Sequence, residues 1–551
     1  MAAGRERWAS RIGLVLAMAG NAVGLGNFLR FPGQVASNGG GAFMIPYFVC
    51  FLLMGIPLMW LEWGMGRYGG VRGHGSTPGM FQLMWRHPIA KYVGVLGLFI
   101  PTVILFYYSC IASWTLGYAV LSATGHLPQV PEVETQLPPE EVQRRVLQPF
   151  DDFLKDYVGQ SKSREGSVLL LQPPVLTYVF FWVVVALNFW VLARGVARGI
   201  EVLAKIAMPL LFLLAITLVV RVLTLGEPVA AGQSPWAGMN FIWEPKWWIE
   251  RDGELRFVLL DPKTWLAAAG QIFFTLSLGM GAIQCYASYL REDDDVMLTG
   301  LSTTSANEFC EVVLGSSIAI PAAVTFFGVV ATQEIAARGT FYLGFTSMPA
   351  IFSYMHGGQY LACLWFLLLF FAAFTSTVAM AQPLLAFLQD EFRIPRVNAV
   401  AFLTIIWVVF SHLCLFLNHA WQVMDYWSGT FGPPLMALVE VVIMMWIFGG
   451  WRMWNEIHKG AELRAPIFFY YAARYVTPVI LLLIFAGMIY DQVRALLSGG
   501  GETGLEGMPA GSPGVWITRV ALLIFLAGLL WLIGWAFSLD HHKERIEGAA
   551  S

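Results

Sequence analysis

Charged residues are scarce in this sequence. Asp, Glu, Lys and Arg make up 13% of its 551 residues, whereas soluble domains typically carry about 25%. Hydrophobic residues account for 57%, and the mean hydropathy is +0.63. The formal net charge of −3 provides no basic surface for nucleic acid. The composition therefore excludes a soluble domain and a nucleic-acid-binding protein, and it indicates a polytopic membrane protein.

Signs of a disulfide-stabilised, glycosylated or catalytic protein are also missing. The six cysteines all fall inside apolar segments, as small buried residues do, and form no disulfide or zinc pattern. No Asn-x-Ser/Thr sequon occurs. There is no metal-ligand cluster and no nucleophile with a His partner, and Gly24-x-Gly26 follows no strand as a phosphate loop would. We therefore expect that the protein is not an enzyme.

Apolar segments long enough to cross a bilayer, which takes about 20 residues, recur along the chain. We predict about twelve spans, near residues 12–36, 41–69, 89–124, 174–194, 199–224, 262–290, 297–328, 358–389, 396–418, 421–449, 466–495 and 514–538. An even number places both termini on one side of the membrane. The short loops of that side and the N-terminal arm are rich in Lys and Arg, which identifies the side as cytoplasmic.

The spans divide the chain into two repeats and a tail. We expect a cytoplasmic arm at 1–11, a five-helix repeat at 12–224, a second repeat at 262–449, two more helices at 450–538 and a cytoplasmic tail at 539–551. The long loops at 125–173 and 225–261 are expected outside. In the first of them, residues 140–147 and 149–158 are predicted to form two separate surface helices.

The first span carries an interruption at its centre, in Gly20-Asn21-Ala22-Val23-Gly24-Leu25-Gly26-Asn27. Each glycine weakens a helix by about 1 kcal/mol, and amides are costly in hydrocarbon unless they are paired. A helix that is broken at the membrane midplane tolerates the glycines, and its freed backbone groups can pair with the amides where they line a cavity. The sixth span has a similar centre, Thr275-Leu276-Ser277-Leu278-Gly279-Met280-Gly281. Two interrupted spans five apart indicate an inverted five-plus-five repeat with a transport site between the breaks, although glycines also serve close helix packing.

Polar side chains at helical spacing face these breaks. Ala372, Ser376 and Met380 share one face of the eighth span, with Thr375 beside them. Membrane Ser and Thr usually bond the i−4 carbonyl, but with carbonyls of the first break they would form an all-oxygen cage suited to a hard cation. Thr303, Asn307 and Glu311 repeat this spacing on the seventh span.

Other candidates lie on the third span and among the charges inside spans. Tyr108 lies four residues after Ile104, and its hydroxyl would bind a carboxylate together with amides at a half-helix N-terminus. Charges inside spans are functional candidates by default; they are Arg30, Glu62, Glu308, Glu311, Asp390 and Asp425. Opposite charges could close the two ends as the pairs Arg30 with Asp425 outside and Arg5 with Asp390 inside.

These motifs resemble the neurotransmitter:sodium symporter family, and most closely its bacterial leucine-transporter branch. The resemblance runs from about Arg5 to the twelfth span. It rests on Arg5-x-x-Trp8, the segment from Gly20 to Pro32, Asn38-Gly39-Gly40-Gly41-Ala42-Phe43, the segment from Gln271 to Gly279, and Asn307-Glu308. It implies an all-α leucine-transporter fold and sodium-coupled uptake of an amino acid, in the inner membrane of a prokaryotic cell.

The resemblance implies two sodium sites. By position, the first would consist of Ala22, Asn27, Thr275 and Asn307, with the substrate carboxylate as a further ligand. The second would consist of Gly20, Val23, Ala372, Thr375 and Ser376.

The resemblance also implies a substrate site and two gates. The backbone of the substrate would meet Asn21, Ala22, Leu25, Gly26, Tyr108, Phe274, Thr275 and Ser277, and its side chain would meet Ile104, Phe274, Met280, Ser376 and Met380. Phe274 and Tyr108 would form the outer lid below Arg30 and Asp425. The inner gate would consist of Arg5, Trp8, Tyr289 and Asp390.

Three features narrow the expected substrate and ions. Gly24 stands where monoamine carriers of the family have an aspartate, so the substrate must bring its own carboxylate, as an α-amino acid does. Glu311 stands where chloride-dependent relatives have a serine, so we expect chloride-independent transport, and this residue could exchange protons. Unbranched Met280 and Met380 adapt their shape, so we expect leucine, methionine or aromatic amino acids as substrates. A membrane receptor that binds amino acids without transporting them is the alternative, and the oligomeric state stays open.

Overall fold

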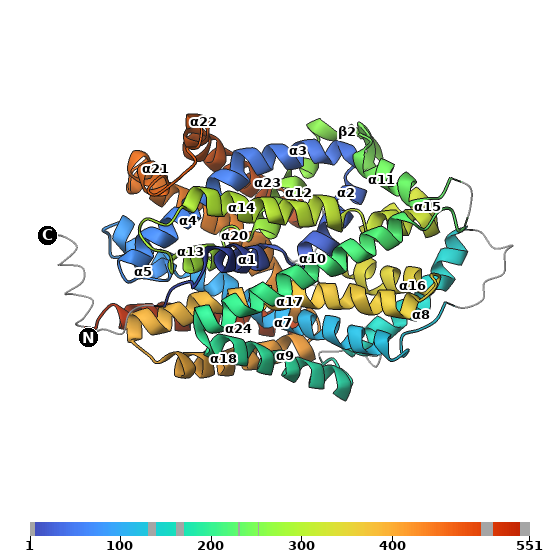
Figure 1. The fold of residues 1–551 in the computed structure, drawn as a ribbon, viewed down its shortest axis with the longest axis horizontal. Coiled ribbons are helices and arrows are strands. Elements are labelled where there is room, and N and C mark those ends of the chain that lie inside the picture. The colour runs from blue at the N-terminus through green and yellow to red at the C-terminus, as the bar shows by residue number, and fades with distance from the viewer. Residues whose placement is uncertain are drawn as a thin grey trace.

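The computed structural model describes residues 6–130, 139–160, 170–229, 232–251, 253–497, 508 and 511–539, and these are mostly helical (Figure 1). Within them, ten helical stretches are long and apolar enough to cross a membrane. They are Gly41–Val71, Ala90–Ala123, Val175–Ala193, Val196–Leu223, Val296–Ala337, Gly358–Phe392, Arg396–Phe416, Ala420–Ile447, Ile467–Tyr490 and Pro513–Ala536. An eleventh is the bent pair Arg11–Ala22 and Gly26–Ser37, whose axes differ by 49°.

The predicted sixth span is present as two pieces, α12 (Pro262–Leu276) and α13 (Ala282–Ala287). Each piece alone is too short to cross a bilayer, which takes about 20 residues. The remaining helices are α1 (Arg11–Ala22), α2 (Phe31–Ser37), α3 (Met44–Cys50), α4 (Ile56–Val71), α5 (Thr77–Met84), α6 (Ala90–Val93), α7 (Leu96–Ala123), α8 (Pro139–Val158), α9 (Val175–Ala193), α10 (Glu201–Leu223), α11 (Pro235–Trp243), α14 (Val296–Glu308), α15 (Ala319–Ala337), α16 (Met348–Ser353), α17 (Gly358–Phe392), α18 (Arg396–Phe416), α19 (Ala420–Asp425), α20 (Gly432–Val442), α21 (Gly450–Ile457), α22 (Ile467–Tyr471), α23 (Thr477–Leu497) and α24 (Pro513–Ala536).

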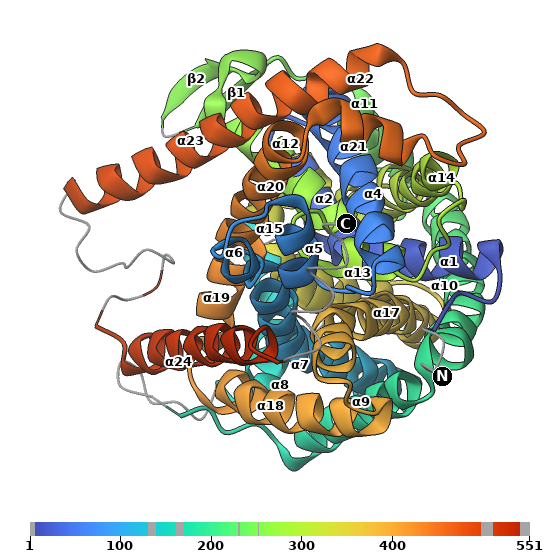
Figure 2. The same cartoon turned by 90° about the vertical axis from the view of Figure 1, so that its left-hand side faces the viewer.

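The helices form a bundle around α7 and α17, which pack against each other over much of their length. The most apolar stretch of the α6–α7 span has 89% of its residues buried. The most apolar stretch of α24 has 28% of its residues buried. The end-on view agrees: α24, α18 and α9 lie at one side of the bundle and α21, α22 and α23 at the other (Figure 2). The outer helices therefore leave their exposed apolar faces to lipid, while α13 and most of α17 are enclosed.

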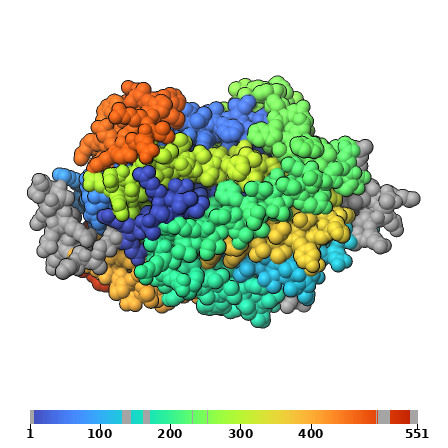
Figure 3. All heavy atoms as spheres, in the orientation of Figure 1, coloured from blue at the N-terminus to red at the C-terminus, as the bar shows by residue number. Residues whose placement is uncertain are grey.

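One end of the bundle is covered by α8, by α11 and by an antiparallel hairpin of β1 (Trp248–Arg251) and β2 (Glu254–Phe257) (Figures 1 and 3). The prediction of two helices at 140–147 and 149–158 is wrong, because α8 runs continuously through Pro149. Proline removes one backbone hydrogen bond, but Val146, Leu147 and Phe150 are each about 1% exposed. Burial of this apolar face keeps the helix continuous.

Candidate functional site

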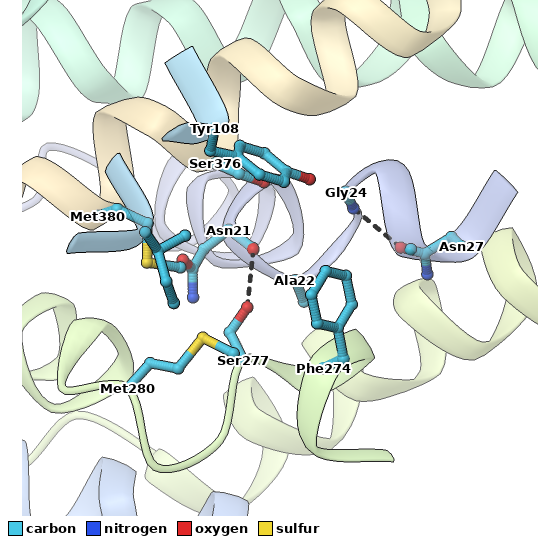
Figure 4. A pocket seen from close by; sticks show the side chains of 12 residues that line it. Asn21, Ala22, Gly24, Asn27, Tyr108, Phe274, Ser277, Met280, Ser376 and Met380 are labelled. Carbon is cyan, nitrogen blue, oxygen red and sulfur yellow. Dashed lines mark hydrogen bonds between the residues drawn. The ribbon is translucent and has the colours of Figure 1, made fainter. Parts of the chain in front are cut away.

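The first break follows α1, where Val23 leaves the helical conformation with φ −72° and ψ 97°. The chain resumes as a π-helical turn at Gly26–Arg30. Two freed backbone N–H groups find side-chain partners. Gly24 N donates to Asn27 Oδ1 at 2.8 Å (Figure 4), and Leu25 N donates to the Tyr108 hydroxyl at 3.0 Å. The predicted break is therefore present, and it satisfies the requirement that buried amides be bonded.

The second break lies between α12 and α13 and is built on left-handed residues. Ser277, Gly279 and Gly281 have φ of 55°, 65° and 80°. A Cβ added to Gly279 would lie 2.1 Å from the carbonyl oxygen of Pro433. The position therefore requires glycine both for its left-handed backbone conformation and for the lack of space. The Ser277 hydroxyl donates to the Asn21 carbonyl at 3.1 Å and joins the two breaks.

A pocket lies between the breaks and is shown in Figure 4. Its lining comes from both breaks, α7 and α17: Asn21, Ala22, Gly24, Gly26, Asn27, Ile104, Tyr108, Phe274, Ser277, Met280, Ser376 and Met380. Ten of these were predicted substrate contacts. Two other predicted contacts do not line the pocket: Leu25 lines the cavity beyond Phe274, and Thr275 is buried behind the wall. Gly24 also lines the pocket, although it was not a predicted substrate contact. Because Gly24 has no side chain, the Tyr108 hydroxyl and Ser376 can lie close to the backbone there.

The residues predicted for a first cation site converge behind this pocket. The side-chain oxygen of Asn307 lies 2.9 Å from Asn27 Nδ2 and 3.2 Å from each of the Ala22 and Thr275 carbonyl oxygens. An amide oxygen facing two carbonyl oxygens is unfavourable unless a cation lies between them or the amide is rotated to donate. Neutral carbonyl, amide and hydroxyl oxygens are ligands that a hard cation prefers, so these residues fit a sodium ion.

The residues predicted for a second cation site meet where α1 packs on α17. A Cβ added to Gly20 would lie 3.2 Å from the Thr375 Cβ, which shows how closely the two helices approach. The hydroxyls of Thr375 and Ser376 donate to the Ala372 carbonyl at 3.3 and 3.0 Å, so each hydroxyl oxygen keeps a lone pair for a cation. Val23 lies at the unwound end of α1, where its carbonyl is freed from the helix.

Glu311 is fully buried beside the first of these clusters. Gln271 Nε2 and the Tyr47 hydroxyl lie 2.9 and 3.0 Å from its Oε1, and Asn27 Nδ2 lies 3.2 Å from its Oε2. The Thr275 hydroxyl also donates to Oε2. The Tyr47 hydroxyl also lies 2.8 Å from Oε2 of Glu308, so the two acidic side chains share this donor. Tyr47 and Gln271 were not among the predicted site residues, although an amide and a hydroxyl inside spans are the same kind of signal that identified Asn307.

The predicted outer gate residues surround a cavity of about 150 Å³ beyond Phe274. The guanidinium of Arg30 lies 4.6 Å from the centre of the Phe274 ring, and Asp425 accepts a 2.7 Å hydrogen bond from Tyr107. Arg30 and Asp425 both line the cavity but do not form the direct ion pair that their opposite charges suggested. The cation–π contact of Arg30 with the lid ring takes its place.

The opposite end of the pocket is closed by the N-terminal arm. Trp8 Nε1 donates to the Tyr286 carbonyl at 3.1 Å, and the Trp8 ring meets Tyr289 edge-on at 6.4 Å. Tyr289 accepts a 2.6 Å hydrogen bond from Gln382. Asp390 lies in the last turn of α17, whereas Arg5 lies outside the described residues. Glu440 and Gln284, which sequence reasoning did not select, lie buried next to Glu62.

Comparisons with known proteins agree with this architecture. Residues 5–497 match the model of the sodium:neurotransmitter symporter family. An uncharacterized sodium-dependent transporter of Methanocaldococcus jannaschii is 28% identical over 90% of this chain and 92% of its own length. The sodium-dependent nutrient amino acid transporter 1 of Drosophila pseudoobscura pseudoobscura is 26% identical over 98% of this chain and 82% of its own.

Among solved structures, the fold is similar to that of MhsT in complex with L-phenylalanine. The TM-score is 0.70, with 26% sequence identity, 88% of this chain covered and 99% of the other. Together with the family match across most of the chain, this likeness supports an all-α fold of membrane-spanning helices. The chain belongs to the sodium:neurotransmitter symporter family, and it is a sodium-dependent membrane transporter and not an enzyme.

Proposed function

We propose that the protein takes up a hydrophobic α-amino acid together with sodium, without chloride, by alternating access. The observation that carries the proposal is the pocket between the two breaks, where Tyr108 and backbone groups face neutral oxygen ligands. The amino acid transporter among the relatives and the phenylalanine-bound structural neighbour support this substrate class.

The substrate carboxylate supplies the ionised ligand that the first cation site lacks. Ala22, Asn27, Thr275 and Asn307 offer only neutral oxygens to the cation, and Glu311 lies behind Asn27 and Thr275 and is bonded to them. No acidic side chain lines the pocket, and at Gly24 the lining has no side chain at all. A substrate carboxylate held by the Tyr108 hydroxyl therefore completes the site, whereas an amine without a carboxylate leaves it incomplete.

The substrate side chain lies at the apolar end of the pocket. Ile104, Met280 and Met380 line this end, and none of these side chains is more than 5% exposed. Burial of an apolar side chain contributes about 1.5–3 kcal/mol, and the thioether chains of two methionines adapt to different shapes. Leucine, methionine and the aromatic amino acids are therefore the substrates that we expect at these walls.

Sodium at both clusters ties the unwound end of α1 to α12, α14 and α17. A ligand shifts a conformational equilibrium only by its different affinity for the two states. Sodium therefore stabilises the arrangement in which the two breaks and α17 stay together around the substrate, and its loss from the second cluster frees α1. Glu311 supplies a fixed negative charge beside the first cluster, which replaces chloride.

The test is uptake of radiolabelled leucine into proteoliposomes under an inward sodium gradient. We expect accumulation with sodium gluconate as well as with sodium chloride, and none with potassium salts. Competition by methionine and phenylalanine, but not by dopamine, tests the substrate class.

Chloride-stimulated uptake by the wild type would contradict the role of Glu311. Sodium-dependent leucine binding without accumulation would overturn transport and favour a receptor that binds amino acids without moving them.

A further inference from the structure

Arg474 is a charged residue at the outside of the bundle that the proposed transport cycle does not use. It lies in the π-helical turn Ala472–Val476 of the span Ile467–Tyr490. With a rise of about 1.5 Å per residue, it lies about 10 Å from the start of that span. Helical side chains point back toward the N-terminus of their helix. The guanidinium therefore lies near the depth at which lipid headgroups meet hydrocarbon.

The protein holds the guanidinium of Arg474 but does not neutralise it. Nη1 donates to the Tyr470 hydroxyl at 2.7 Å, and the buried Nε has no acceptor among the described residues. Within the same residues, no Asp or Glu forms an ion pair with Arg474, whereas Arg67 pairs with Glu456. A guanidinium has five N–H donors, and a charge inside a span is costly unless it is paired. Arg474 therefore keeps donors and charge for an anion from outside the chain.

Aromatic rings fix the position of this guanidinium at the surface. Its carbon lies 5.1 Å from the centre of the Trp446 ring and 5.6 Å from that of Tyr475, and both side chains are about half-exposed. A Cβ added to Gly450, the first residue of α21, would lie 3.0 Å from Nη1, so the glycine leaves room for the group. Tryptophan and tyrosine are enriched where a membrane meets water. The surroundings of Arg474 are therefore those of a membrane interface.

An exposed apolar strip leads from this site toward the middle of the span. Val479 and Leu482 follow Tyr475 by four and seven residues, so the three side chains share one face of the helix, and all are exposed. A cation that continues into an apolar strip is suited to an amphiphile, whose charged headgroup meets the cation while its acyl chain covers the strip. A free phosphate ion would use only the cation.

We propose that Arg474 binds the phosphate of an anionic phospholipid, whose acyl chain lies along Val479 and Leu482. The planar guanidinium matches two phosphate oxygens, and basic sites between membrane helices bind anionic headgroups. No carboxylate pairs with Arg474 within the described residues, so none is at hand for the ammonium group of a zwitterionic lipid. A headgroup with net negative charge, such as that of phosphatidylglycerol, is therefore favoured. Because Gly450 and Arg474 lie side by side, the bound lipid joins α21 to the span that follows it.

Native mass spectrometry of the full chain, titrated with phosphatidylglycerol, tests the site without any transport substrate. Arg474→Gln should weaken binding of the first phosphatidylglycerol about tenfold or more, because hydrogen bonds to charged groups are lost. Arg194 is the matched control, since its guanidinium lies 3.8 Å from the ring of the exposed Trp190 near the N-terminal arm. Arg194→Gln should keep the wild-type affinity. Equal losses in both variants, or no loss in Arg474→Gln, would overturn the proposal.

Two further titrations identify the ligand. Phosphatidylcholine should bind the wild type about fivefold more weakly than phosphatidylglycerol, as one basic residue near the surface accounts for. An excess of inorganic phosphate should not displace the lipid. Equal affinity for the two lipids would refute an anionic lipid site, and displacement by phosphate would identify a free anion as the ligand instead.

Arg474→Lys serves if Arg474→Gln fails to fold. It keeps the positive charge but loses the two-pronged donor, so it should weaken phosphatidylglycerol binding at least about threefold. Wild-type affinity in Arg474→Lys would contradict recognition of the phosphate by the guanidinium.

Discussion

At the scale of single residues, the Tyr108 hydroxyl has two roles. It accepts from Leu25 N at 3.0 Å and lines the pocket, so it holds the unwound segment and remains able to donate to a carboxylate. A hydrogen bond to a charged group contributes about 1.5–3 kcal/mol. Tyr108→Phe should therefore weaken leucine binding by about 10-fold to 150-fold at saturating sodium, as measured by scintillation proximity. Tyr107→Phe, which loses a bond to Asp425 instead, is the control; equal losses in both variants would contradict a carboxylate contact at Tyr108.

In the proposed function, Glu311 takes the place of chloride. In Glu311→Ser the fixed charge disappears while the donors Tyr47, Gln271 and Asn27 remain around the vacated space. These donors suit a small anion, so uptake in gluconate should fall about tenfold or more and chloride should restore it. Uptake of labelled leucine in the two salts measures this. A variant that is equally active in both salts would show that Glu311 does not replace chloride.

In the proposed function, the absence of a side chain at Gly24 favours amino acids over amines that lack a carboxylate. A Cβ at this position would lie 3.0 Å from the Tyr108 hydroxyl and 3.3 Å from Ser376 Oγ. Gly24→Asp would place a carboxylate where the substrate carboxylate binds, so leucine affinity should fall at least 100-fold. Equilibrium binding of labelled leucine checks this, with Gly24→Asn as the uncharged control of similar size. Equal losses in both variants would assign the effect to size and not to charge.

At the scale of elements, the second break depends on backbone conformations that only glycine adopts easily. Gly279 has φ 65° and touches the Pro433 carbonyl. Gly279→Ala should push the break away from α20 and cost about 1–3 kcal/mol, the usual cost of a residue held in an unfavourable conformation. Thermal unfolding should show the loss, and Gly487→Ala on α23, where an added Cβ meets nothing closer than 3.8 Å, is the control.

Both broken elements could be predicted from sequence, because glycines weaken a helix and amides at the centre of an apolar span need polar partners. The way the gates close could not be predicted. Opposite charges suggested a bond between Arg30 and Asp425. In the structure, Arg30 instead contacts the Phe274 ring, and Asp425 accepts a hydrogen bond from Tyr107. Pairing depends on which side chains the packed helices bring within reach, and the sequence of each span by itself does not contain that information. Glu440 was missed for a simpler reason: it stands alone in an apolar span and matched no motif.

At the scale of the whole molecule, the arm meets α13, the half-helix after the second break, at Tyr286. Trp8 reaches across from the arm to its carbonyl, and Ser10 bonds Glu201 on α10. Trp8→Ala removes the hydrogen bond and two ring contacts, which should shift the population toward a state open at that end and weaken leucine binding about tenfold. Hydrogen exchange of the first turn of α1 should rise in this variant. Exchange that matched the wild type would show that the arm does not hold this end closed.

The neutral ligands around Asn307 also determine how the protein responds to membrane voltage. A zwitterionic amino acid adds no net charge, and the proposed first site has no ionised ligand of its own, so each sodium ion carries its full charge across the bilayer. Moving one elementary charge through 100 mV is worth about 2.3 kcal/mol, which is nearly a fiftyfold factor in accumulation. Under the proposed function, we therefore expect an energised membrane to concentrate the substrate electrically as well as chemically.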